Sequence, residues 1–72
     1  MRYVAYDITD GESVRLGEGT IEEIEQLLSV RYPGGKLCGV PHSRYRGWTT
    51  APDVDIMRAE DEEAFLAEIA RP

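Results

Sequence analysis

The segment from Thr20 to Arg31 carries the clearest structural signal of this 72-residue sequence. Thr20 and Glu23 have the spacing of a capping box, in which each side chain accepts a hydrogen bond from the backbone N–H of the other residue. The apolar residues lie at helical spacing and form one stripe, consisting of Ile21, Ile24, Leu27 and Leu28. Pro33 and the two glycines after it end the helix. Because a helix with one apolar stripe must bury it against a second layer, the neighbouring segments decide the fold.

The residues before this helix alternate between apolar and polar types, which predicts a β-hairpin. Strands are expected over Tyr3–Thr9 and Ser13–Gly17, with Asp10 and Gly11 as the turn signal. A two-residue turn would place the apolar residues of the second strand on the face opposite those of the first. We therefore predict a longer loop or a bulge. The expected cross-strand pairs are Ile8 with Val14 and Tyr6 with Leu16.

The residues after the helix give weaker signals. Positions 33 to 52 hold three prolines and four glycines, so Lys36–Val40 and Trp48–Thr50 are expected only as short strands. Asp53–Arg58 alternates and predicts another strand. Asp61 has the side chain of an N-cap for a last helix over Glu62–Ala70.

This element order predicts a single α+β domain over residues 1–72. We expect a two-layer fold of β-β-α-β(β)-α order, with an antiparallel sheet of three to five short strands and both helices on one face. The expected core consists of Val4, Tyr6, Ile8, Val14, Leu16, Ile21, Ile24, Leu27, Leu28, Val54, Ile56, Phe65, Leu66 and Ile69.

The net charge of −6 is distributed unevenly along the chain. Residues 1 to 30 and residues 53 to 72 each carry seven acids against two arginines, a balance of −5 for each segment. Residues 31 to 52 carry no acid and four bases, in addition to His42. The chain therefore combines two acidic segments with a basic, aromatic centre.

The sequence gives little support to an enzymatic function. Cys38 and His42 could act as nucleophile and base or as two metal ligands, but Gly39 and Pro41 argue against the helix that their spacing would need. A lone cysteine forms no internal disulfide and no cysteine-built zinc site. We therefore expect neither catalysis nor a cofactor.

The acidic helix starts are the first candidate binding surface, formed by Glu22, Glu23, Glu25, Glu60, Asp61, Glu62 and Glu63. Carboxylates three or four residues apart on a helix lie about 5–6 Å apart at their Cβ atoms, close to the phosphate spacing along a nucleic-acid strand. Such an array could enter a groove lined with arginine and lysine. In the alternative interpretation, these are solvated residues that the helix dipole favours at helix starts.

The central segment is the second candidate surface, formed by Arg44, Tyr45, Arg46 and Trp48. Alternating guanidinium groups and rings suit nucleic acid, and the same residue types are enriched at protein–protein hot spots. The flanking acidic segments disfavour free nucleic acid, because the long-range field opposes its approach. Alternatively, Trp48 fills the core and the arginines pair with acids of the helices.

In its acid clusters Glu22-Glu23-x-Glu25 and Glu60-Asp61-Glu62-Glu63 and in its small size, the chain resembles small phage-encoded anti-CRISPR proteins. The resemblance is to the DNA-mimicking inhibitors of type I surveillance complexes. It implies a non-enzymatic inhibitor that docks on the DNA-binding face of a subunit and blocks binding of target DNA or of the PAM.

Our leading prediction is therefore an acidic protein that docks on a basic nucleic-acid-binding partner. One alternative is a nucleic-acid-binding module that uses Lys36 together with the central segment, and another is a small adaptor that pairs through an edge strand or through the Trp48 region. No apolar run approaches the roughly 18 residues of a membrane span, and the N-terminal residues lack a signal-peptide core. We expect a cytoplasmic protein, in a bacterial host if phage-encoded, with no membrane partner.

Overall fold

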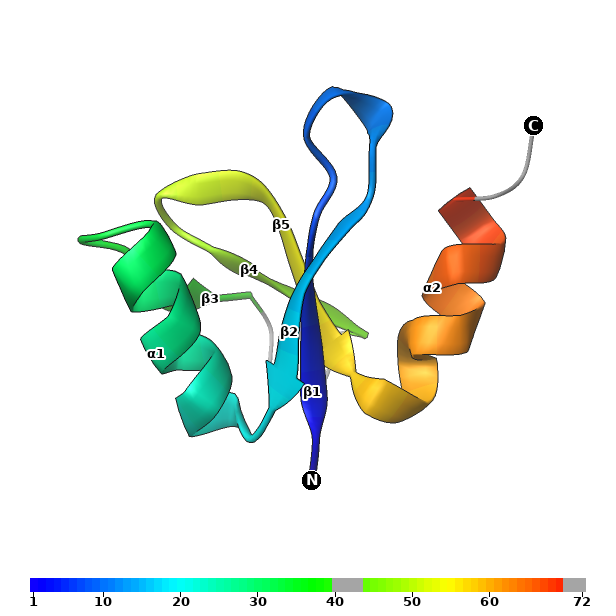
Figure 1. The fold of residues 1–72 in the computed structure, drawn as a ribbon, viewed down its shortest axis with the longest axis horizontal. Coiled ribbons are helices and arrows are strands. Elements are labelled where there is room, and N and C mark those ends of the chain that lie inside the picture. Colours follow the sequence, from blue (N-terminus) through cyan, green and yellow to red (C-terminus); the bar gives the residue numbers. More distant parts are fainter. Residues whose placement is uncertain (40–43, 70–72) are drawn as a thin grey trace.

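A computed structural model describes residues 1–39 and 44–69 of the chain (Figure 1). It contains one antiparallel sheet in the strand order β2-β1-β5-β4-β3 and two helices, which confirms the α+β class. The elements are β1 Tyr3–Asp7, β2 Val14–Gly19, α1 Ile21–Arg31, β3 Leu37–Cys38, β4 Tyr45–Trp48, β5 Ala51–Arg58 and α2 Glu62–Ile69, with 3-10 turns at Thr9–Gly11 and Ala59–Asp61. The predicted ends at Val40 and Ala70 lie outside the described residues.

The two helices cover opposite faces of the sheet, so the expected two-layer arrangement is wrong (Figure 1). Ala5 and Ile56 pair across β1 and β5 and belong to the core beneath α1. Their neighbours Val4 and Met57 also pair, point to the other face, and pack with Phe65 of α2. Because β1 and β5 carry apolar side chains on both faces, each face needs its own covering layer.

The β1–β2 hairpin contains both a long loop and a bulge, as predicted, but its pairs differ from the expected ones. Tyr6 faces Arg15 and Ala5 faces Gly17, so Leu16 is the extra residue of the bulge. Leu16 packs against the core beneath α1. Val14 faces Asp7 rather than Ile8 and is 50% exposed, so it is not a core residue.

Helix α1 has the predicted capping box: Glu23 N–H donates to Thr20 Oγ1, and Thr20 N–H donates to Glu23 Oε1. Ile24 and Leu28 are buried, while Leu27 lies over Gly17 of β2. A Cβ atom at Gly17 would lie 2.7 Å from Leu27 Cδ1. The missing side chain therefore lets the helix approach the edge strand closely.

Helix α2 begins differently from the prediction. Asp61 is the last residue of a 3-10 turn that runs directly into the helix, and no hydrogen bond among the described residues makes it an N-cap. Phe65 is buried, with ring centroids 4.9 Å from Tyr6 and 5.8 Å from Tyr45. Leu66 and Ile69 are 41% and 42% exposed, so their expected place in the core is wrong.

Candidate binding surfaces

Both helices begin at the same end of the sheet. Tyr3 of β1 faces Gly19, where β2 ends, and on its other side it faces Arg58, where β5 ends. Helix α1 begins two residues after Gly19, and the 3-10 turn that leads into α2 follows Arg58 directly. The acidic helix starts therefore lie at one end of the molecule, on either side of the sheet, at the bottom of Figure 1. We call this the acidic end, formed by Glu22, Glu23, Glu25, Glu60, Asp61, Glu62 and Glu63.

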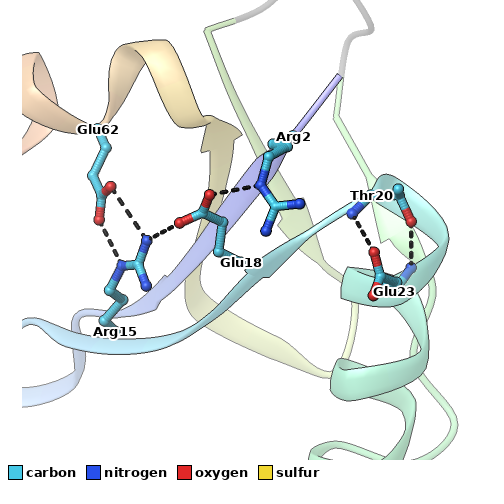
Figure 2. Close-up of polar contacts among 6 residues, drawn as sticks. All are labelled: Arg2, Arg15, Glu18, Thr20, Glu23 and Glu62. Carbon is cyan, nitrogen blue, oxygen red and sulfur yellow. Dashed lines mark hydrogen bonds and ion pairs between the residues drawn. The ribbon is translucent and has the colours of Figure 1, made fainter.

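A chain of alternating charges runs along β2 on the side of the sheet that α2 covers (Figure 2). The Arg15 guanidinium donates to Glu62, with Nε 2.7 Å from Oε2, and also to Glu18. Glu18 in turn accepts from Arg2 Nε at 2.8 Å. The hydrogen bond from Arg15, with a second one from the Tyr6 hydroxyl, lowers the pKa of Glu62. Glu62 therefore stays ionised and ties α2 to the sheet.

Sequence reasoning missed this chain of charges because the residues of a regular strand alternate between its two faces. Arg15 and Glu18 would then point to opposite sides. The bulge at Leu16 places Arg15 beside Tyr6 and Glu18 beside Val4, and these two residues of β1 share one face.

The acidic end contains anchored and free carboxylates. Glu60 lies 3.5 Å from Arg58, and Asp61 lies 4.0 Å from Arg44. Glu23 accepts the Thr20 backbone N–H, which lowers the pKa of its carboxyl group. Within residues 1–39 and 44–69, no ion pair or side-chain hydrogen bond involves the remaining carboxylates, those of Glu22, Glu25 and Glu63.

The central segment does not form one exposed surface. Arg44 donates to Glu68 of α2 at 3.0 Å, and the Tyr45 hydroxyl donates to the same carboxylate at 3.1 Å. Trp48 is 3% exposed and belongs to the core beneath α1, so its expected role as a surface contact is wrong for this fold. Arg46 Nε is buried and has no hydrogen-bond partner among the described residues. The alternative in which Trp48 fills the core and an arginine pairs with helix acids is confirmed for Trp48 and Arg44.

The enzyme hypothesis rests on Cys38 and His42, and the structure describes only Cys38. Cys38 is a free, partly buried cysteine on β3, beside Gly47, and His42 lies outside the described residues. In the part of the chain that the structure describes, no three histidine, cysteine or acidic side chains are placed to hold a metal ion.

Comparison with family models, curated proteins and solved structures finds no match to this chain. Among the helices of the described residues, none has both the length and the apolar character that a membrane span requires. The surfaces therefore have to be interpreted from their own geometry and charge.

Proposed function

We propose that this protein is a non-enzymatic binding protein whose acidic end docks on the basic, nucleic-acid-binding surface of a partner protein. The observation that supports it is the joint placement of the two acidic helix starts at one end of the sheet. Free carboxylates occur on both sides of this end, on α1 at Glu22 and Glu25 and on α2 at Glu63. They would meet the lysine and arginine side chains that otherwise bind phosphates.

The free carboxylates stand on supported elements. Helix α1 is fixed by its capping box and by the buried Ile24 and Leu28. Helix α2 is fixed by Phe65 and by the ion pair between Arg15 and Glu62. Because these helices are already ordered, docking would cost less conformational entropy than docking of a disordered acidic tail.

The resemblance to DNA-mimicking anti-CRISPR proteins suggests a subunit of a type I surveillance complex as one partner of this kind. Occupation of its DNA-binding face would block target DNA or the PAM by competition. Such a mechanism needs neither a cofactor nor a catalytic residue.

A competition assay tests the proposal. Partners are captured from the source cell or its natural host, identified by mass spectrometry and purified, and a purified type I surveillance complex is tested in parallel. We expect the wild-type protein to displace labelled target DNA from such a partner in a gel shift, and more salt to weaken this effect. The triple variant Glu22→Lys/Glu25→Lys/Glu63→Lys should lose the displacement.

The control reverses two charges at the other end of the sheet. Glu12 and Asp53 are exposed beside the β1–β2 loop, and Ile8 N–H donates to the carbonyl oxygen of Asp53 there. Glu12→Lys/Asp53→Lys should therefore keep full displacement. Equal displacement by the triple variant, or equal loss in the control, would refute docking through the acidic end.

A further inference from the structure

A groove of about 620 Å³ lies between α1 and β2, away from α2. Its apolar lining includes Leu16 from the strand and Leu27 and Val30 from the helix. Val30 is 78% exposed, although it is among the most apolar residue types. The volume falls in the range of about 300–1,000 Å³ that is usual for ligand pockets. The groove is therefore a candidate docking surface with both apolar and charged lining residues.

The groove runs beside an edge strand. β2 is the outermost strand of its side of the sheet, so one side of its backbone has no strand partner among the described residues. An extended peptide can pair with such an edge and place every second side chain in the adjacent groove. The bulge at Leu16 divides the regular pairing of β2 into two short stretches, Val14–Arg15 and Gly17–Gly19. This favours a short peptide over a second copy of the chain, because sheet-to-sheet pairing needs a longer uninterrupted edge.

The two ends of the groove carry opposite charges. Glu23 lies at the end where β2 finishes, because a Cβ atom at Gly19 would touch its side chain. Glu23 uses Oε1 for the capping box, whereas Oε2 accepts no hydrogen bond from the described residues. Arg31 lines the opposite end, where the next residue along, Tyr32, donates to Asp7 opposite the first residue of β2. A peptide antiparallel to β2 would therefore begin beside a carboxylate and finish beside a guanidinium group.

We propose that this groove binds an extended peptide segment of a partner protein, antiparallel to β2, with a basic side chain at its start and apolar side chains at alternate positions after it. The basic side chain pairs with Glu23, and the apolar side chains pack on Leu16, Leu27 and Val30. This docking goes beyond the proposed function, because it uses the flank of α1 and requires no nucleic-acid-binding partner.

The test uses a displayed library of random twelve-residue peptides, selected in parallel on the full chain and on the Val30→Gln protein. We expect the enriched peptides to share a basic residue followed by alternating apolar residues. The strongest peptide, measured by fluorescence polarisation, should bind Val30→Gln about tenfold more weakly and Glu23→Gln about threefold more weakly. Glutamine at position 23 still completes a capping box, and Val30 is largely in solvent, so both variants should keep the helix.

Matched controls lie on the opposite face of the sheet. Ile69→Gln removes an apolar side chain that is 42% exposed on α2, and Glu63→Gln removes one of its carboxylates, so both should bind the peptide as the wild type does. Amide chemical shifts of the labelled protein should change along β2 and α1 when the peptide is added. The proposal is overturned if no peptide is enriched over the Val30→Gln protein, or if the shifts fall on α2. It is also overturned if sedimentation finds a dimer that Val30→Gln dissociates, because the groove would then be occupied by a second copy.

Discussion

The substitution Gly35→Ala gives the sharpest test of how the core beneath α1 is packed. Gly35 lies against the indole ring of Trp48, whose Nε1 donates to the carbonyl oxygen of Tyr32 at 3.1 Å. A Cβ atom at position 35 would lie 2.0 Å from Nε1, 2.6 Å from Cε2 and 2.5 Å from Thr50 Oγ1. Because the indole is rigid and buried, the ring or the backbone must move.

The expected cost follows from three contributions to the free energy of unfolding. Overpacking costs about 1–3 kcal/mol, and an indole N–H that loses its buried acceptor costs about 1–3 kcal/mol more. Gly35 has no positive φ, so alanine recovers about 0.4–1 kcal/mol from the unfolded state. The net loss is about 3 kcal/mol, which is most of the roughly 3–5 kcal/mol expected for a domain of this size.

Urea unfolding followed by circular dichroism measures this loss. With an m-value of about 1 kcal/mol/M, the midpoint should fall by about 3 M. The neighbouring Gly34→Ala is the matched control, because Gly34 has φ +82° but no atom within 4 Å of the added Cβ. Its cost should be only the left-handed backbone strain, about 1–2 kcal/mol.

A double-mutant cycle identifies the contact responsible. Phenylalanine has a smaller ring system and no indole N–H, so with Trp48→Phe in place the methyl group added at position 35 breaks no hydrogen bond to Tyr32. Gly35→Ala/Trp48→Phe should therefore destabilise by less than the sum of the single changes. Additivity within about 0.5 kcal/mol would refute this packing, as would a Gly35→Ala protein no less stable than Gly34→Ala.

Three further predictions concern ionisation and capping. The hydrogen bond from Arg15 lowers the pKa of Glu62, so the stabilisation from this ion pair is present above about pH 4.5 and is lost as the pH falls. Glu62→Gln should therefore lower the urea midpoint at pH 7 and reduce the loss of stability between neutral and acidic pH. An unchanged dependence of the urea midpoint on pH in acid would contradict this. Burial, followed by the nearby Asp53, raises the pKa of Asp55, so stability falls as the pH rises through its titration. Asp55→Asn should therefore raise the urea midpoint at pH 7 and leave it unchanged at pH 3, whereas a lower midpoint at pH 7 would argue against an unfavourable buried charge. Thr20→Ala removes the cap acceptor and should cost about 1 kcal/mol in the same unfolding assay, with Ser29→Ala, which removes only a hydroxyl bonded within α1, costing less.

The features predicted correctly from the sequence are mostly local. The capping box and the apolar stripe of α1 depend on residues within a few positions of one another, and the structure has both. Strands β1, β2 and β5 also follow from short-range alternation, whereas β4 occupies Tyr45–Trp48 and the strand predicted at Trp48–Thr50 is wrong. Phe65 is buried as predicted, because a large apolar side chain gains free energy when it leaves water.

The features that the sequence did not reveal depend on the register between distant segments. Trp48 lies in an aromatic, arginine-rich stretch that also suits a surface, and only its packing against α1 and β5 decides that it is buried. Leu66 and Ile69 have the helical spacing of a core stripe, yet α2 rests on the sheet mainly through Phe65. Spacing along a helix identifies a face but not how much of it the sheet covers.

The sequence by itself determined that the chain has two helices, each beginning with carboxylates, because the helix dipole and the capping groups act within a single turn. Only the tertiary structure decided where those helix starts lie. β2 and β5 are both antiparallel to β1 and flank it, so both strands finish beside Tyr3 and both helices begin at that end. The same sheet is apolar on its two faces and therefore places the helices on opposite sides, which divides the acidic end between two layers.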